Sequence, residues 1–408
     1  PHSSQNISLS TMRRLGWPTA LTITSTCFNV RAVMPESSSG EIVKQHYLDE
    51  YAQLYDHVGM LRDHERMRSY HDAIKLNSKA HFEGKVVLDV GTGTGVLAIW
   101  AAQAGAKRVY AVEASGIGKL TTALINAHGF DEVVTLLRGR VEDQQLPEQV
   151  DVIVSEWMGY FLLRESMVSS VLFARDRWLK PGGVMYPSHS RLMLAPLHSP
   201  SFMKKREEDV LRSMEEWDGM AAELESRYSL KMGSLRSAMH AEHFAYSFRQ
   251  AWQGPVPAAA MTAKPEEAAV LLELDMRTCT EKDLFGWRRS VQLRPLGGTR
   301  AVEALCGWFD VRFCAHGDVE ADTCVELDTS PFVEGTHWGQ TVFALSPPLI
   351  LDEATIYLTQ SARDHHNLNV TIEYNGDVSA SYAVTADFTG FDGDESDDGA
   401  SAYDDDWQ

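Results

Sequence analysis

Cysteine is scarce in this sequence, and its pattern argues against two common kinds of site. The chain of 408 residues has five cysteines, and none of them forms a Cys-x-x-Cys pair. Zinc sites that use sulfur are usually built on such pairs, so we expect no metal centre. An odd number of widely spaced thiols also favours a reducing compartment over a disulfide framework. No run of roughly eighteen apolar residues occurs, so the sequence predicts no membrane span.

Basic residues are also in the minority. The chain has 37 Lys and Arg against 57 Asp and Glu, which gives a formal net charge of -20. Direct binding to nucleic acid is disfavoured, because a phosphate backbone needs clustered Lys and Arg. An acidic surface suits cationic partners, although the same surface also keeps a protein soluble. The length and the 44% hydrophobic content predict a globular protein of two domains.

The two ends of the chain differ from its middle. Residues 1–41 are rich in Ser and Thr and carry Arg13, Arg14 and Arg31. This composition fits a disordered extension, which we prefer, or an organelle transit peptide. Residues 390–408 are dominated by acids and Gly, and we expect them to be a disordered acidic tail.

The clearest local pattern is a strand, a glycine-rich turn and a helix. Residues 85–90 read as a buried strand, 91–95 as a G-x-G-x-G turn, and 96–102 as the start of a helix. A second strand at 108–112 is followed by Glu113. Glycines let the backbone approach a ligand closely, and an acid in this position can accept hydrogen bonds from ribose hydroxyls. The spacing departs from the G-x-G-x-x-G of dinucleotide sites, so a nucleoside methyl donor is favoured over NAD.

Two acids stand nine residues apart beyond a later strand, which follows another strand at residues 133–137. The apolar segment 150–154 reads as a strand, and Glu156 and Glu165 follow it on either side of an aromatic run. In an open α/β sheet, ligands bind just past the carboxyl ends of the strands. Two carboxylates there can grip a guanidinium, which offers its donors in a fixed fork. On these residues alone, two solvated acids are an equal interpretation.

The pattern changes beyond Ser188. Short β-like runs predict an antiparallel sheet or barrel, at residues 191–196, 269–276, 290–296, 305–313, 323–328, 340–345, 354–358 and 369–374. One helical insertion, Phe202–Leu230, carries an apolar stripe that must be buried on its own barrel or on another subunit. Two helical stretches precede the first strand. The first begins at Ile42 and is expected to show one apolar face made by Tyr47, Tyr51, Leu54, Tyr55 and Val58; the second runs from Asp63 to Lys79.

Four motifs in this order resemble the protein arginine methyltransferases. Residues 87–95 resemble the family's first cofactor motif, and Glu156 through Met167 resemble its double-E loop. Residues 336–338, Thr-His-Trp, resemble a third family motif. Its N-terminal helices are matched by Tyr47, Tyr51, His57, Met60 and Arg66, although the family commonly has Tyr-Phe where this chain has Tyr-Leu at 47–48. The resemblance covers about residues 42–388 and looks closest to a plant-type branch of type I enzymes.

The resemblance implies the architecture. It predicts an α/β fold in which a Rossmann-like methyltransferase domain with lid helices, residues 42–187, is followed by an antiparallel β-barrel, residues 188–389. The helical insertion, taken as about residues 202–230, is then the family's dimerisation arm, and the implied assembly is a homodimer.

The resemblance also implies the site residues, with S-adenosyl-L-methionine as cofactor and no metal. Implied for catalysis are Glu156, Glu165, His337 and Asp63. The cofactor residues are Arg66 for the methionine carboxylate, Asp89 near the amine, Glu113 for the ribose, Val141 and Glu142 for the adenine, and Gly91, Gly93, Gly95, His57, Met60 and Tyr51 around them. Trp338, Met158 and Tyr47 are implied to contact the substrate.

The implied reaction is methyl transfer to an ω-nitrogen of protein arginines in histone tails and Gly/Arg-rich proteins. Met60 stands where type I enzymes have Met, which implies monomethyl- and asymmetric dimethylarginine. The location we expect is the cytoplasm and nucleus. The alternatives are a small-molecule methyltransferase, which predicts neither a Thr-His-Trp motif nor two acids nine apart, and a non-catalytic scaffold that uses the barrel and the acidic tail.

Overall fold

The computed structural model describes residues 48, 51–293, 301–314, 323–350, 353–362, 364–374 and 378–385. The expected N-terminal extension, Tyr47 and the acidic tail lie outside these ranges. Within them, no helix is long and apolar enough to cross a membrane. The same ranges contain no group of three or more His, Cys, Asp or Glu side chains placed to hold a metal ion.

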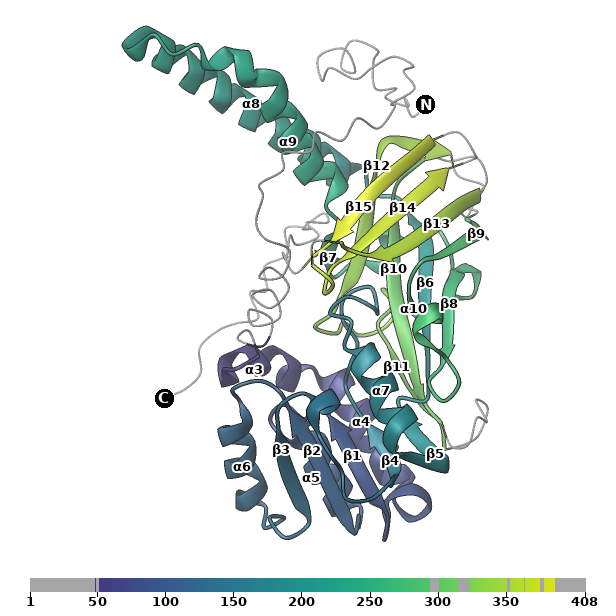
Figure 1. Ribbon diagram of the computed structural model, residues 1–408. Helices are drawn as coiled ribbons and strands as arrows, with labels where there is room; N and C mark the ends of the chain where they lie inside the picture. The colour runs from purple at the N-terminus through teal and green to yellow at the C-terminus, as the bar shows by residue number, and fades with distance from the viewer. Residues whose placement is uncertain are drawn as a thin grey trace, which may run out of the picture.

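The lower body in Figure 1 is a five-stranded parallel sheet with strand order β3-β2-β1-β4-β5. Its strands are β1 Val86–Val90, β2 Arg108–Glu113, β3 Val134–Arg138, β4 Val150–Val154 and β5 Leu179–Tyr186. Every residue of β1 is buried, as expected for a central strand covered on both faces. The strands start and end close to where the apolar runs of the sequence place them.

Helices cover both faces of this sheet. They are α4 His64–Leu76, α5 Val96–Gln103, α6 Gly118–Ala127 and α7 Val168–Trp178, with α3 Leu54–Arg62 at the carboxyl edge. Gly95 caps α5 with a φ of 94°, and a Cβ there would lie 3.0 Å from the Thr121 side chain. The position therefore needs glycine for its backbone angle and for its space.

The first helical stretch departs from the prediction. Leu48 is helical, Tyr51 lies in a turn, and α3 begins at Leu54. Leu54 and Tyr55 of the predicted apolar face lie on the surface of the chain, where their side chains are 46% and 83% exposed. Tyr51 departs from this face, because it lies outside α3 and lines a pocket.

The upper body is antiparallel. One sheet has the order β7-β12-β10-β6-β8 with β11 paired to β10, and a second has the order β15-β14-β13-β9. The strands are β6 His189–Leu197, β7 Trp252–Gly254, β8 Ala269–Asp275, β9 Trp287–Gln292, β10 Ala301–Phe313, β11 Val325–Asp328, β12 Gln340–Ile350, β13 Glu353–Gln360, β14 Leu368–Tyr374 and β15 Val378–Val384. Each of the eight predicted runs overlaps one of them, although residues 294–296 lie outside the described ranges. The sequence missed β7, which has three residues, and β15, whose small residues give a weak alternation.

The helical insertion is a hairpin rather than one helix. The 29-residue helix α8, Pro200–Tyr228, is followed by a short turn and by α9, Arg236–Arg249. The predicted end at Leu230 is wrong because α9 packs back along α8, where the Ser213 hydroxyl and the His243 ring nitrogen lie 2.7 Å apart. Figure 1 shows this hairpin projecting away from the barrel. We call residues 200–249 the arm.

The cysteines also differ from the expectation of separate thiols. A disulfide joins Cys314 to Cys324, while Cys279 and Cys306 are buried and free. The pairing of β10 with β11 sets Phe313 opposite Val325, which brings the two residues just beyond them together. The spacing of ten residues in the sequence did not reveal this, because it depends on the register of the two strands.

Candidate active site

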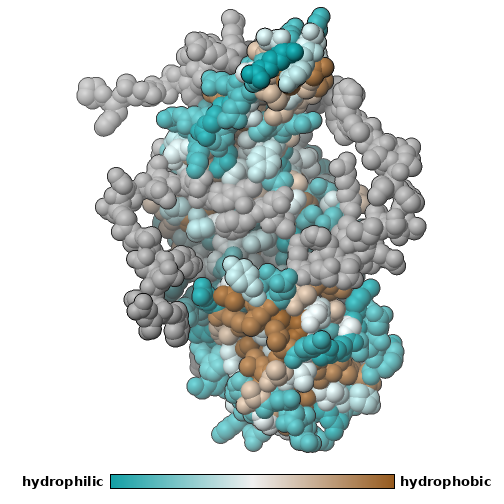
Figure 2. Space-filling model, turned by 90° about the vertical axis from the view of Figure 1, so that its left-hand side faces the viewer, coloured by the Kyte–Doolittle hydropathy of each residue, from teal (hydrophilic) through white to brown (hydrophobic). Residues whose placement is uncertain are grey.

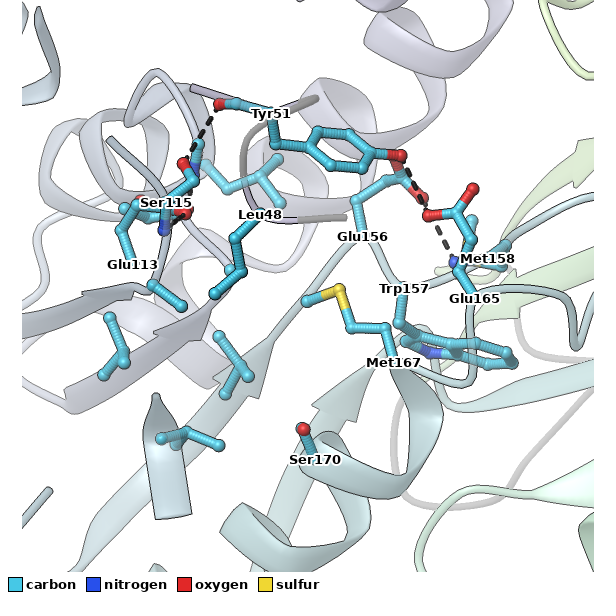
Figure 3. A pocket seen from close by; sticks show the side chains of 18 of the residues that line it. Leu48, Tyr51, Glu113, Ser115, Glu156, Trp157, Met158, Glu165, Met167 and Ser170 are labelled. Carbon is cyan, nitrogen blue, oxygen red and sulfur yellow. Dashed lines mark hydrogen bonds between the residues drawn. The ribbon is translucent and has the colours of Figure 1, made fainter. Parts of the chain in front are cut away.

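A cavity of about 600 Å³ lies at the carboxyl edge of the parallel sheet. This volume is in the range of small-molecule and cofactor sites. The turn after β1, the end of β2, the loop after β4 and helices α3 and α4 all line it. A barrel segment, residues 360 and 364–366, forms another part of its wall. Figure 3 shows Glu113 and Ser115 on one side of the cavity and Glu156 and Glu165 on the other.

The loop that carries Glu156 and Glu165 has an uncommon backbone. Phe161, Leu162, Glu165 and Ser166 all have φ between 51° and 80°. Non-glycine residues adopt this region at an energetic cost, so the surroundings must hold them there. The Phe161 ring packs on the backbone of β10, where a Cβ on Gly307 would lie 2.3 Å from it. The barrel therefore fixes the shape of this loop.

Glu156 is held from two sides. Its Oε2 accepts hydrogen bonds from Arg66 Nε at 3.1 Å and Nη2 at 2.9 Å. Its Oε1 accepts from the Met158 amide at 3.2 Å. The remaining terminal nitrogen of Arg66 donates to the Met60 carbonyl at 3.0 Å. The structure thus places Arg66, assigned to a cofactor carboxylate, against an acid of the site.

Glu165 has its own set of partners. The Tyr51 hydroxyl donates to its Oε2 at 2.8 Å, and Arg164 Nη1 donates to its Oε1 at 2.9 Å. Its amide donates to the His366 carbonyl at 2.6 Å. Figure 3 shows Tyr51 spanning the cavity toward the two acids. Both carboxylates are therefore fixed in orientation at one end of the cavity.

Asp63 and His337 lie together although 274 residues separate them in the chain. Asp63 Oδ2 lies 2.6 Å from the Nδ1 of His337 and accepts from its amide at 2.9 Å. Burial acts to raise the pKa of Asp63, but hydrogen bonds from His337 and the Arg66 amide outweigh it and lower that pKa below its ordinary value. Trp338 donates from Nε1 to the Met158 carbonyl at 2.9 Å. Asp63, His337 and Trp338 sit beside the cavity and do not line it.

The opposite end of the cavity holds the residues assigned to the cofactor. Glu113 accepts from the amides of Gly93 and Ser115, both at 2.7 Å. The Thr92 hydroxyl donates to Asp89 Oδ2 at 2.6 Å, while Asp89 Oδ1 is buried with no hydrogen-bond partner in the described part of the chain. Burial raises the pKa of Asp89 to about 7, despite the hydrogen bond from Thr92.

The remaining assigned residues fall along the same wall. His57 lies against Gly93: a Cβ added to Gly93 would be 3.3 Å from the His57 ring. Val141 is buried, and Glu142 accepts from the Ser170 hydroxyl at 2.6 Å. The residues of the set that line the cavity are Tyr51, His57, Met60, Arg66, Gly91, Gly93, Glu113, Val141, Glu142, Glu156, Met158 and Glu165. Asp89 and Gly95 stand behind this wall, and Tyr47 lies outside the described residues.

Some lining residues were not found from the sequence. Met167 lies over the glycine turn, because a Cβ on Gly91 would be 2.2 Å from its terminal methyl. The barrel segment 360–366 carries no motif, so no local signal marks it. Arg164 does not line the cavity but contacts Glu165, and its one sequence signal is that it is the only cation in the apolar and aromatic run 157–164.

Comparison with known proteins defines the class. A methyltransferase domain model matches residues 87–183, and a model described as the arginine methyltransferase oligomerization subdomain matches residues 203–379. Protein arginine N-methyltransferase PRMT10 of Oryza sativa subsp. japonica is 43% identical over 341 residues, which cover 82% of this chain and 88% of the rice protein.

Solved structures agree. The crystal structure of Arabidopsis thaliana protein arginine methyltransferase 10 matches with a TM-score of 0.75 and 38% identity, covering 82% of this chain and 99% of that one. The Trypanosoma brucei PRMT1 enzyme-prozyme complex with AdoHcy matches with a TM-score of 0.66 and 30% identity, covering 83% of this chain and 100% of that one. The chain belongs to the protein arginine N-methyltransferase family and uses S-adenosyl-L-methionine. The resemblance, the fold class and the cofactor predicted from the sequence are confirmed.

The residues present fit this cofactor. Asp89 Oδ1, behind the glycine turn, is a buried acceptor that lacks a donor among the described residues. The Glu113 carboxylate is oriented by two amides and keeps further lone pairs for hydroxyl groups. Arg66, Glu113, Val141 and Glu142 are then the side chains that would hold the cofactor. When bound, it supplies an electrophilic methyl group on a sulfonium.

We predict a pH signature for Asp89. Its reference pKa is 3.8 and its pKa in the folded protein is about 7, so between these values the folded state binds more protons. Stability then falls as the pH rises through this window, by up to about 1.4 kcal/mol per unit. Asp89→Asn removes this term, so its melting temperature relative to wild type should rise steadily between pH ~5 and ~7.

A matched control is Asp151→Asn. Burial acts to raise the pKa of Asp151, but the Val86 amide and Lys180 outweigh it and lower that pKa below 3.8. The contribution of Asp151 to stability is therefore constant between pH ~5 and ~7. The difference in melting temperature between Asp151→Asn and wild type should not change with pH in this window. If the melting-temperature difference from wild type is independent of pH for both variants, Asp89 is ionised throughout this window and the prediction is wrong.

Proposed function

We propose that this enzyme is a type I protein arginine N-methyltransferase that forms monomethyl- and asymmetric dimethylarginine. Its substrates are Arg-rich segments such as histone tails and Gly/Arg-rich proteins, in the cytoplasm and nucleus. The observation that carries the proposal is the pair Glu156 and Glu165, fixed at one end of the cavity that Met60 also lines. Met60 joins this end through the hydrogen bond from Arg66 to its carbonyl.

The two acids act as a guanidinium clamp. A guanidinium is a poor nucleophile, because it stays protonated and its charge is delocalised over three nitrogens. Glu156 and Glu165 each accept N–H groups and draw positive charge onto the nitrogens they contact. The third nitrogen recovers lone-pair character and is held in one orientation. Alignment and fixed charge supply most of the rate gain.

Asp63 and His337 are the route for the proton that leaves the substrate nitrogen. Because the pKa of Asp63 is lowered, its carboxylate stays ionised and holds a proton on His337 Nδ1. The other ring nitrogen is then the one able to accept a proton. Asp63 also caps α4 by accepting from the Arg66 amide at 2.9 Å, which ties the relay to the helix that carries Arg66.

Product analysis tests the type I assignment. With an Arg-Gly peptide, the wild-type enzyme should give monomethyl- and asymmetric dimethylarginine, identified by tandem mass spectrometry. Met60→Phe should lower the ratio of dimethyl to monomethyl product, because a larger ring leaves less room beside the methylated nitrogen. Symmetric dimethylarginine as the sole dimethyl product would overturn the assignment.

The clamp is tested by Glu156→Gln and Glu165→Gln. Each removes one charge and keeps the shape, so kcat should fall by about 10²–10³-fold. The dissociation constant for S-adenosyl-L-homocysteine should not rise in Glu156→Gln, because Arg66 loses a competing carboxylate. Glu148→Gln, at an exposed ion pair with Arg108, is the control and should keep wild-type activity. Retained kcat in both clamp variants would refute this role.

The arm supports a homodimer. Its exposed apolar side chains are Leu211, Met220, Tyr228, Leu230, Leu235 and Tyr246. Figure 2 shows apolar surface gathered on the Rossmann-like body on its α3 and α6 side, where Leu54, Tyr55 and Leu120 are exposed. The arm of one subunit docking on this face of its partner buries both sets. In the Trypanosoma brucei relative, the crystallised assembly is a heterotetramer.

Deletion of the arm tests the dimer. Removing residues 200–249 and closing the gap with a short Gly-Ser linker should give monomers, seen by light scattering, with weakened cofactor binding. Removing residues 202–230 alone leaves α9 without its partner and is not a clean test. A point variant on the docking face, Tyr55→Glu, should also shift the protein from dimer toward monomer, because it places a charge on an apolar surface. Full activity in a proven monomer would contradict this assembly.

A further inference from the structure

Arg164 is a buried cation beside the clamp. Its side chain is 9% exposed, and its Nη1 lies 2.9 Å from Glu165 Oε1. Its guanidinium also lies 5.9 Å from the centre of the Tyr160 ring. A cation buried this deeply next to a carboxylate holds that carboxylate in one orientation. The substrate is itself a guanidinium, so the site contains a resident group of the same chemistry as its ligand.

The barrel holds Arg164 in place. Arg164 Nε approaches Asn367 Oδ1 at 3.4 Å, and Asn367 Nδ2 donates to Asp364 Oδ2 at 3.0 Å. Both residues belong to the turn between β13 and β14. The chain from Arg164 to this turn therefore joins the loop of the Rossmann-like body to the barrel.

The same turn also grips the backbone next to Arg164. The Glu165 amide donates to the His366 carbonyl at 2.6 Å, and the Ser166 hydroxyl donates to the His365 carbonyl at 2.6 Å. Glu165 and Ser166 have φ values of 80° and 59°, so these contacts support a backbone that would otherwise relax. The turn thus holds Glu165 in two ways: directly, through the Glu165 backbone amide, and indirectly, through the side chain of Arg164.

We propose that Arg164 is a positioning residue that occupies Glu165 Oε1 and directs the substrate guanidinium to Oε2, where the Tyr51 hydroxyl also binds. This inference rests on the proposed clamp. Arg164 and the substrate repel each other, because both are cations at the same carboxylate. Arg164 therefore weakens substrate binding and improves its alignment. Its loss should separate the two effects, lowering kcat without raising KM.

The test is Arg164→Met, which keeps an unbranched apolar stem in place of the aliphatic part of arginine and removes the guanidinium charge. With an Arg-Gly peptide, kcat should fall by about tenfold or more, since small errors of alignment at a reacting centre are costly. The KM for the peptide should stay equal or fall, and the affinity for S-adenosyl-L-homocysteine should be unchanged. Arg164→Lys restores the charge without the fork and should recover part of kcat. Active-site titration corrects each kcat for the folded fraction.

A double variant separates positioning from folding. If Arg164 acts through Glu165, then Arg164→Met should cause no further loss of kcat in a Glu165→Gln background. The matched control is Arg175→Met, because Arg175 is equally buried and donates to the carbonyls of Met276 and Cys279 away from the cavity. That control should lower the melting temperature and leave kcat and KM of the folded enzyme unchanged.

Three results would overturn the proposal: an unchanged kcat in Arg164→Met, a raised KM for the peptide in that variant, or an equal loss of kcat in the wild-type and Glu165→Gln backgrounds. Failure of the clamp itself is distinguishable, because Glu165→Gln alone would then retain full activity.

Discussion

The left-handed turn of the backbone between Glu156 and Glu165 is the constraint on which the rest of the site depends. Four non-glycine residues in this loop hold positive φ angles, and such a conformation persists only where its surroundings enforce it. The supports come from the barrel: Phe161 against β10, and the Glu165 amide against the turn before β14. The two bodies in Figure 1 thus build the site together: the barrel fixes the geometry of the loop, and the loop after β4 of the parallel sheet carries the two acids.

The charges of the two acids are also held by neighbouring groups. Each acid of the clamp has a fixed cation beside it, Arg66 for Glu156 and Arg164 for Glu165. Two carboxylates that face one cavity repel each other, and the adjacent guanidinium groups offset this repulsion and hold each carboxylate in one orientation. Arg66 comes from the helix next to the cofactor end, whereas Arg164 is tied to the barrel through Asn367. The two acids are therefore oriented by different parts of the molecule, Glu156 by helix α4 and Glu165 by the barrel.

Much of the fold and part of the site follow from the sequence for physical reasons. β1 and β4 are apolar apart from one aspartate each, Asp89 and Asp151, because central parallel strands are buried on both faces. The glycine turn is marked because its backbone angles require glycine. What could not be predicted depends on three-dimensional placement. Tyr51 leaves its expected helical face because its hydroxyl reaches an acid 114 residues away. The same holds for α9, whose partner is α8, and for Cys314, whose partner is set by strand register.

The cavity draws its walls from both ends of the folded region, from Leu48 to His366. During synthesis the chain emerges from its N-terminus, and the parallel sheet can form while the barrel is still being made. The clamp, however, lacks the turn that holds Glu165 until β13 and β14 have emerged. A nascent or prematurely terminated chain therefore carries the residues of a methyltransferase without its working site. The order of the chain makes completion of synthesis a condition for activity.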